Sequence, residues 1–269
     1  MSETTWKTAI TQVKPNEIRL RGYRIDELMG NATFGQAIFL ALKGELPSPG
    51  VARMIEAILV SSIDHGATPP SALAARTSAS TGAPLNAALA AGILSINRFH
   101  GGAIYDCMGI LKDGIQRAAD TGKTLEAVAG EMVDEYRASG KRMAGLGHRI
   151  HTDDPRTARL FSLADEARVA DQGVAMIIAL RDAFATKARS LPINVDGAIA
   201  ALLIDLQMPR DLANAFFIMA RVPGLVAQIH EELSRERPMR FIHPTDHEYD
   251  GPEPRQLPSE TAPPSSQQA

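Results

Sequence analysis

Apolar residues recur at helical spacing along most of this 269-residue chain, and no other feature limits its possible folds as strongly. Residues 33–43, 51–62 and 84–96 carry this pattern first, and glycine, proline or polar residues follow each of them. Aromatic residues make up only 5% of the chain, and Ala and Leu are abundant, which favours helices over sheets. The sequence therefore predicts an all-α fold.

The remaining segments extend this prediction along the chain. Further helices are expected up to Ala118 and over residues 125–139, 156–170, 171–189, 197–206 and 212–235. Residues 14–28 are charged and contain residues 19–23, which are expected to form a strand or turn, whereas Pro69-Pro70 interrupts a small and polar stretch over residues 64–82. Residues 256–269 are predicted to be a disordered tail behind one domain that covers residues 1–255.

Composition and charge restrict the class of protein. The net charge of −3 gives no reason to expect binding to nucleic acid or to an anionic membrane surface. Cys107 is the only cysteine, so no disulfide framework can form within the chain, and a reducing compartment fits. The first residues lack the apolar core of a signal peptide, and no uninterrupted apolar run reaches the length of a membrane span. We expect a cytoplasmic protein.

The stretch from Gly145 to Arg156 concentrates groups that suit chemistry. Gly145 and Gly147 flank Leu146 and let backbone amides approach a ligand closely. His148 follows and can polarise a carbonyl or move a proton near neutral pH. Arg156 stands behind an Asp-Pro turn and can grip a carboxylate with two parallel hydrogen bonds. This set of groups exceeds what a turn between two helices requires.

Three other positions each have a functional and a structural interpretation. His100, followed by two glycines, either meets a ligand or starts a helix as a satisfied histidine. Asp196 either caps a helix or is a partly desolvated base. Arg221, inside a strongly apolar helix, needs either a structural carboxylate or an anionic ligand.

A metal site is a weaker candidate. His243 and His247 lie four residues apart, but Pro244 argues against a helix between them, and no Cys or third His is near in sequence. A solvated loop is the better interpretation of this segment. The sequence also contains no phosphate-binding glycine loop and no nucleophile elbow. No metal ligands are therefore predicted.

Taken together, these segments resemble the citrate synthase family, most of all its short citryl-CoA lyase members and the C-terminal domain of ATP-citrate lyase. The similar segments occur in the family's order and are residues 18–28, 37–47, Asp64-His65, 75–77, 90–103, 145–156, 194–196, Ala220-Arg221 and His230-Glu231. Each motif is short, but their order and spacing together carry the resemblance.

The resemblance implies a role for each site residue. His100 would stabilise the enol form of a thioester, Asp196 would move the methyl proton, and His148 would polarise a ketone or accept a hydroxyl proton. Substrate carboxylates would be held by His65, Arg156, Arg221 and, across a dimer interface, Arg237. Coenzyme A would lie against the backbone of Gly145, Leu146 and Gly147.

The resemblance also implies an architecture and an activity. The chain would form an intertwined homodimer with a compact large-domain part and a small-domain part over about residues 104–210. It would cleave (3S)-citryl-CoA to acetyl-CoA and oxaloacetate by a retro-Claisen reaction, with the CoA thioester as substrate and without a metal or a tightly bound cofactor. The short length favours cleavage over synthesis. The alternatives are a citrate or 2-methylcitrate synthase, a lyase for a related ester such as citramalyl-CoA, and a non-catalytic acyl-CoA-binding protein.

Overall fold

The computed structural model describes residues 6–147, 154–240, 248 and 250–253, and it is helical almost throughout. The first helices are α1 (Ile25–Leu28), α2 (Phe34–Lys43), α3 (Pro49–Ser61), α4 (Pro70–Ser80), α5 (Leu85–Leu94) and α6 (Ala103–Thr121). They are followed by α7 (Leu125–Ser139), α8 (Pro155–Ala167), α9 (Gln172–Lys187), α10 (Val195–Asp205), a 3₁₀ turn (Arg210–Leu212) and α11 (Ala213–Arg235). The prediction of an all-α fold is confirmed for the body of the chain. The predicted tail over residues 256–269 lies outside the described residues.

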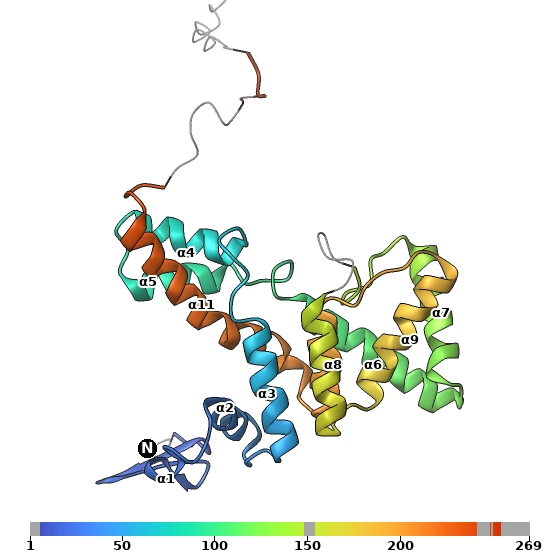
Figure 1. Cartoon of the computed structure of the whole chain (residues 1–269), viewed down its shortest axis with the longest axis horizontal. Coiled ribbons are helices and arrows are strands. Elements are labelled where there is room, and N and C mark those ends of the chain that lie inside the picture. Colours follow the sequence, from blue (N-terminus) through green and yellow to red (C-terminus); the bar gives the residue numbers. More distant parts are fainter. Residues whose placement is uncertain (1–5, 148–153, 241–247, 249, 254–269) are drawn as a thin grey trace, which may run out of the picture.

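A small antiparallel sheet precedes the helices (Figure 1). Its strands are β1 (Thr11–Lys14), β2 (Glu17–Leu20) and β3 (Tyr23–Arg24), in the order β1-β2-β3. The turn between β2 and β3 places Gly22 at a φ of 91°, a conformation that glycine adopts at little cost. The strand or turn expected near residues 19–23 is confirmed, and β1 extends it.

Helix boundaries follow local signals in most places. Thr33 and Gln36 form a reciprocal capping box at the start of α2, and Gly44 ends that helix in the left-handed region. The prediction missed α4, because it treated Pro69-Pro70 as a break. Pro70 instead occupies the first turn of α4, where the missing amide hydrogen costs no helical hydrogen bond.

The helices form two lobes (Figure 1). In the first, α6–α10 pack around one another, with α7 against α9 and α10 against both α6 and α9. This α6–α10 lobe includes the stretch predicted as the small-domain part. In the second, α4, α5 and α11 pack together, and α11 also contacts α3 and α6. We refer to this second group as the α4–α5–α11 lobe.

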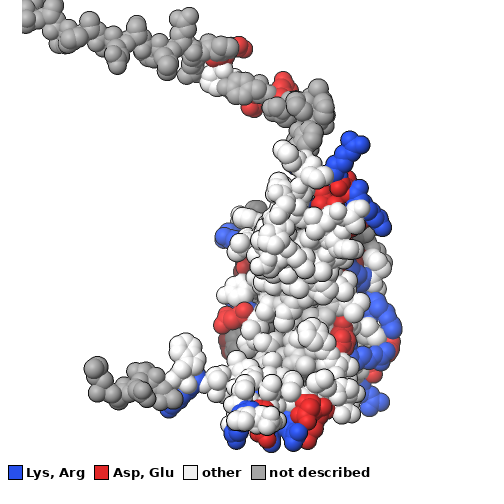
Figure 2. Space-filling view, turned by 90° about the vertical axis from the view of Figure 1, so that its left-hand side faces the viewer, with Lys and Arg blue, Asp and Glu red and all other residues white. Residues whose placement is uncertain are grey.

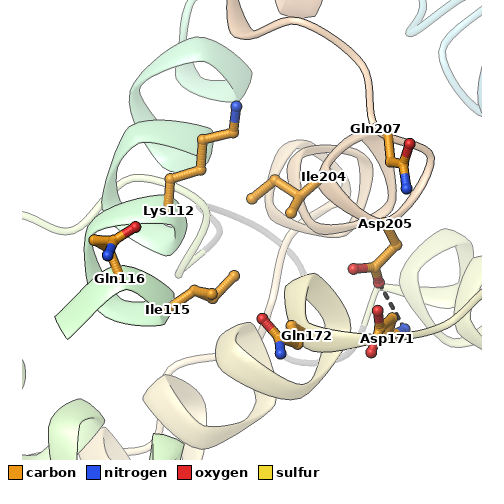
Figure 3. Close-up of a pocket in the computed structure, with 8 residues that line it drawn as sticks. All are labelled: Lys112, Ile115, Gln116, Asp171, Gln172, Ile204, Asp205 and Gln207. Atoms are coloured by element: carbon orange, nitrogen blue, oxygen red, sulfur yellow. Dashed lines mark hydrogen bonds between the residues drawn. The ribbon is translucent and has the colours of Figure 1, made fainter. Parts of the chain in front are cut away.

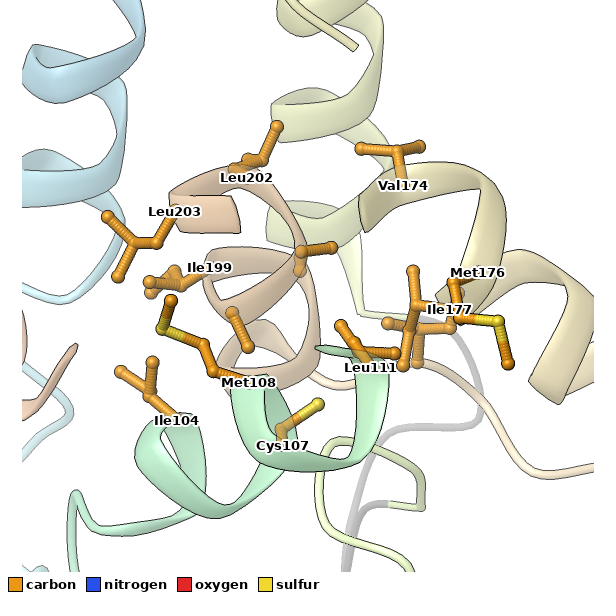
Figure 4. Packing of buried hydrophobic residues seen from close by; sticks show 14 of the residues in the cluster. Ile104, Cys107, Met108, Leu111, Val174, Met176, Ile177, Ile199, Leu202 and Leu203 are labelled. Carbon is orange, nitrogen blue, oxygen red and sulfur yellow. The ribbon is translucent and has the colours of Figure 1, made fainter. Parts of the chain in front are cut away.

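The α6–α10 lobe has a large aliphatic core (Figure 4). Leu111 from α6, Ile177 from α9 and Leu202 from α10 are completely buried there. The core continues through α8 to α3, which joins this lobe to the N-terminal elements. A dense core of this kind fixes the first turn of α10, where one candidate catalytic residue lies.

Helix α11 is long and apolar enough, by length and composition, to cross a membrane when the preceding 3₁₀ turn is included, over Arg210–Arg235. Half of its most apolar window is buried in the protein, as in the core helix of a folded domain. Pro223 lies inside the helix, and the helix runs on to Arg235 as predicted.

Candidate active site

His100 lies in the turn between α5 and α6, and a buried hydroxyl holds its ring. Its Nε2 is 2.8 Å from Oγ of Ser71, a completely buried residue in the first turn of α4. The ring of Phe217 meets the imidazole edge-on, with the two centroids 5.7 Å apart. Among the described residues Nδ1 has no hydrogen-bond partner, so this nitrogen is the one placed to serve a ligand.

The surroundings of His100 favour its neutral form. Burial lowers the pKa of His100, and the positive charge of Arg221 and the neighbouring His65 lower it further. A neutral imidazole can donate one hydrogen bond without carrying charge into the site. That property suits a group that stabilises an enol or a thioester oxygen.

The glycines after His100 are required by close packing. A Cβ on Gly101 would lie 2.7 Å from the ring of Phe217, and Gly101 has a φ of 86°. A Cβ on Gly102 would collide with the backbone of Arg98. The structure therefore favours a tight turn leading into α6, and Gly102 is the residue before that helix.

Asp196 lies in the first turn of α10 and does not cap the helix. The N-cap is Asn194, whose side-chain oxygen accepts from the amide of Gly197 at 3.0 Å. The interpretation of Asp196 as a cap is therefore wrong, because the N-cap lies two residues earlier and Asp196 is already inside the helix. Burial raises the pKa of Asp196, while the charges of Arg156 and Arg221 act in the opposite direction. A raised pKa suits a carboxylate that takes and returns protons.

Backbone hydrogen bonds tie the glycine segment to the start of α10. The amide of Asn194 donates to the carbonyl of Gly145 at 3.1 Å, and its side-chain nitrogen donates to the carbonyl of Gly147 at 2.8 Å. A Cβ on Gly145 would collide with Sγ of buried Cys107. The Gly147 amide donates to Pro192, so it is occupied within the protein. This amide is therefore not available to CoA, and the predicted contact with CoA would depend on the close approach that the glycine backbone allows.

Arg156 is oriented by its own helix cap. Its Nε and Nη2 donate to the two carboxylate oxygens of Asp154 at 3.0 and 2.8 Å, and that carboxylate also accepts from the amide of Arg156. Asp154 is buried, whereas the side chain of Arg156 is 24% exposed. The pairing leaves Nη1 without a hydrogen bond to any described residue, and this edge of the guanidinium can serve an anion.

Arg221 is buried in α11 without a carboxylate at salt-bridge distance among the described residues. Its Nε donates to the carbonyl of Ser62 at 3.0 Å, and its guanidinium lies 4.7 Å from the centroid of Phe217. Burial lowers the pKa of Arg221, and the acidic groups Asp64 and Asp196 oppose that change. A buried guanidinium in such surroundings is satisfied most fully by an anionic ligand.

The remaining predicted site residues lie in several other parts of the chain. His65 is exposed in the loop after α3, near enough for its charge to act on His100. Arg237 is exposed just beyond α11. His148 lies outside the described residues, as do His243 and His247. Within the described parts of the chain, no three His, Cys, Asp or Glu side chains are placed to hold a metal ion.

Electrostatic influence links several of the predicted residues. Arg221 acts on both His100 and Asp196, and Arg156 also acts on Asp196. These residues come from α8, α10, α11 and the turn before α6, so the candidate site that they would form lies where the two lobes meet. Sequence reasoning missed Ser71, Asp154 and Asn194. Asp154 and Asn194 stand in capping positions that a search for helix starts could have found.

A separate pocket of about 330 Å³ lies away from these residues, between α6, α9 and the end of α10 (Figure 3). Its lining includes Lys112, Gln172 and Asp205. Asp205 accepts hydrogen bonds from the amides of Asp171, Gly173 and Val174, which caps the start of α9. These contacts give the carboxylate a structural role.

The fold and the site together define a member of the citrate synthase family. Residues 47–245 match the family described as citrate synthase, C-terminal domain, and the chain belongs to that family. Among solved structures it is similar to citryl-CoA lyase from Hydrogenobacter thermophilus, with a TM-score of 0.85 and 42% identity, over 94% of this chain and 97% of that one.

Two curated relatives are less similar. ATP-citrate synthase beta chain protein 2 of Arabidopsis thaliana is 28% identical over 209 residues, which are 71% of this chain and 33% of that protein. Putative citrate synthase 2 of Mycobacterium bovis is 30% identical over 217 residues, which are 78% of this chain and 54% of that protein. The chain thus spans about a third to a half of the length of these relatives.

Proposed function

We propose that this protein is a citryl-CoA lyase that cleaves (3S)-citryl-CoA to acetyl-CoA and oxaloacetate. The observation that carries the proposal is the 42% identity to a citryl-CoA lyase over nearly the whole of both chains. The grouping of His100, Asp196, Arg156 and Arg221 where the lobes meet supports it, because these are the side chains that such a cleavage needs.

In the proposed reaction, a base removes the proton of the tertiary hydroxyl group, and we assign this role to His148. The electrons of that O–H bond form the ketone of oxaloacetate, and the adjacent carbon–carbon bond breaks. Its electron pair passes to the thioester as an enolate, which His100 stabilises by a hydrogen bond from Nδ1 to the oxygen. Asp196 in its acid form then protonates the enolate carbon and yields acetyl-CoA.

The binding residues divide between the two ends of the substrate. Arg156, Arg221 and His65 are proposed to hold the carboxylates of the oxaloacetate part. Among the described residues, Nη1 of Arg156 has no hydrogen-bond partner, and Arg221 has no carboxylate at salt-bridge distance. The backbone from Gly145 to Gly147 is proposed to lie against CoA. CoA enters and leaves as part of the substrate and product, and no tightly bound cofactor is assigned.

A second copy of the chain is proposed to cover the α4–α5–α11 lobe. This side of the molecule presents a broad surface with few charges (Figure 2). Leu73, Leu85, Leu94 and Leu233 are each about half exposed or more, at 47%, 50%, 76% and 57%. Apolar surface of this extent is typical of an interface. In the dimer Arg237 would reach the partner's site, and light scattering that shows a monomer at micromolar concentration would contradict that role.

The second candidate is a citrate synthase, which the 30% identity to putative citrate synthase 2 favours. A synthase joins acetyl-CoA and oxaloacetate and also hydrolyses the thioester. The deciding experiment incubates the purified protein with citryl-CoA and, separately, with acetyl-CoA plus oxaloacetate. Acetyl-CoA and oxaloacetate from the first mixture support the lyase, whereas net citrate and free CoA from the second would overturn it.

Asp196→Asn separates an enzyme from an acyl-CoA-binding protein. The variant keeps the shape of the side chain but cannot carry the proton, so turnover should fall by about 10²–10⁴-fold while citryl-CoA still binds. A parent protein that binds citryl-CoA without any turnover would instead support the non-catalytic alternative.

A further inference from the structure

One face of α11 holds the loop that carries His65. Arg221, Gly224 and Gln228 are spaced three and four residues apart, so they lie on the same side of the helix. The segment 62–66 runs along this face. Arg221 Nε donates to the carbonyl of Ser62 at 3.0 Å, and a Cβ on Gly224 would collide with the carbonyl of Ile63.

Gln228 makes the third contact of this face. Its side-chain Nε2 donates to the two carboxylate oxygens of Asp64 at 3.3 and 3.1 Å. The orientation of the amide is fixed from behind, because Arg76 Nη1 donates to the Gln228 oxygen at 2.6 Å. Arg76 in turn donates through Nε to buried Glu232 at 2.7 Å. With its oxygen occupied by a guanidinium, the amide must present its nitrogen to Asp64.

The Asp64 carboxylate also shapes the turn around His65. Its Oδ2 accepts from the backbone amide of Gly66 at 3.0 Å, and Gly66 has a φ of 81°. His65 lies between these two residues. The conformation of its backbone is thus set by a carboxylate whose own position depends on Gln228.

We propose that Gln228 is a positioning residue, which holds Asp64 and thereby places His65 in register with Arg221 for binding of the oxaloacetate part of the substrate. Gln228 is 8% exposed and bonds to Arg76 and Asp64, so it acts through the loop and not on the substrate. The inference rests on the proposed function for the identity of the ligand. The contacts that hold the loop do not depend on the identity of the ligand.

The first test replaces the amide by an apolar side chain of similar length, in Gln228→Met. The inhibition constant of oxaloacetate as a product inhibitor should rise about tenfold, because a hydrogen bond to a charged group is lost. The inhibition constant of acetyl-CoA and the kcat should stay close to the parent values. Glu231→Gln is the matched control, because Glu231 contacts Arg76 at 3.3 Å without touching Asp64.

The second test reverses the polarity of the contact. Gln228→Glu keeps an oxygen toward Arg76 but sets two carboxylates against each other, so oxaloacetate binding should weaken more than in Gln228→Met. Adding Asp64→Asn supplies a new donor and should restore much of the loss. The non-additivity of the two changes measures their coupling.

A direct readout of the loop does not depend on turnover. In protein with isotopically labelled histidine, the imidazole signal of His65 is identified by its absence from His65→Gln. This signal should shift in folded Gln228→Met and stay in place in Glu231→Gln. An unshifted signal together with unchanged oxaloacetate inhibition in Gln228→Met would overturn the proposal, as would equal changes in the control. A parent protein that does not cleave citryl-CoA would refute the proposed function, while the His65 signal would still decide whether Gln228 holds the loop.

Discussion

The two lobes are stabilised in different ways. The α6–α10 lobe is filled with large aliphatic and methionine side chains, among them Leu111, Met176 and Ile177, which are completely buried. The α4–α5–α11 lobe has a small core that consists of Ala75, Ala79, Ala88, Leu225 and Ile229. A buried polar network supplements this small core, in which Arg76 and Arg240 share the carboxylate of Glu232.

The difference indicates what each lobe contributes. The dense core of the first lobe holds Asp196 and the glycine segment in fixed positions. In the second lobe, short alanine contacts bring α4, α5 and α11 close together, and directional hydrogen bonds set the positions of His100, His65 and Arg221. This lobe also leaves apolar surface exposed, which the proposed second copy would cover.

The largest expected effect on stability comes from Glu232→Ala in the second lobe. The side chain of Glu232 is completely buried, and its removal leaves Arg76 buried without its main acidic partner. We expect the free energy of unfolding to fall by about 3–5 kcal/mol in urea titrations. Glu166→Ala, which breaks exposed ion pairs with Arg53 and Arg159, should lower the free energy of unfolding far less, because solvent screens these charges. Equal losses of stability in the two variants would show that the buried polar network does not stabilise this lobe.

Leu111→Ala tests the apolar core that stabilises the first lobe. The side chain is completely buried against α9 and α10, so truncation should cost about 2–5 kcal/mol through lost burial and a residual cavity. The same urea titrations measure this effect. Val60→Ala provides the control, since Val60 is 64% exposed and lies in α3, outside the proposed interface, so its truncation should leave the free energy of unfolding nearly unchanged.

Asn194→Ala should have a smaller effect on stability and a clear effect on catalysis. The substitution removes the side-chain cap of α10 and the hydrogen bond to the Gly147 carbonyl. The free energy of unfolding should fall by about 1–2 kcal/mol. Because Asp196 lies in the turn that Asn194 fixes, kcat should fall in a variant that remains folded at the assay temperature. Asn194→Ser keeps a capping oxygen but loses the hydrogen bond to Gly147. If its kcat fell as far as that of the alanine variant, the lost hydrogen bond to Gly147, and not the cap, would be responsible.

The smallest effect concerns the pH dependence of stability. Burial raises the pKa of Asp196, so the folded state holds this proton more tightly than the unfolded state does. Its contribution to stability is therefore greatest at acid pH and is lost as pH rises from the ordinary value of 3.8 through the raised pKa. Asp196→Asn should then have a higher Tm than the parent at neutral pH, with a gain that shrinks toward acid pH. A gain that is constant with pH would show that the carboxylate is not the cause.

Most helices were predictable because their apolar periodicity and their ends are local properties of the sequence. The exception is α4, where Pro69-Pro70 indicates either a break or a helix start, and only the packing of Ala75 and Ala79 on α11 decides between them. His100, Asp196, Arg156 and Arg221 could be proposed as site residues through the resemblance to the family, since His100, Asp196 and Arg221 taken singly also had structural interpretations.

The residues that orient them from distant parts of the sequence could not be proposed. Ser71 meets His100 across 29 positions, and Gln228 meets Asp64 across 164. The first contact exists because α4 packs against α5 and the turn that follows it, and the second because α11 packs beside α3, which the spacing of residues along the chain does not reveal.

In the proposed reaction the site breaks a carbon–carbon bond and then protonates an enolate. The most direct measurement is the cleavage of citryl-CoA in deuterated water, followed by mass spectrometry of the products. We expect oxaloacetate together with acetyl-CoA that carries one deuterium in its methyl group, because the exchangeable proton of Asp196 is delivered to carbon. Citrate and free CoA as the only products would mean that the thioester is hydrolysed and that the protein is not a lyase.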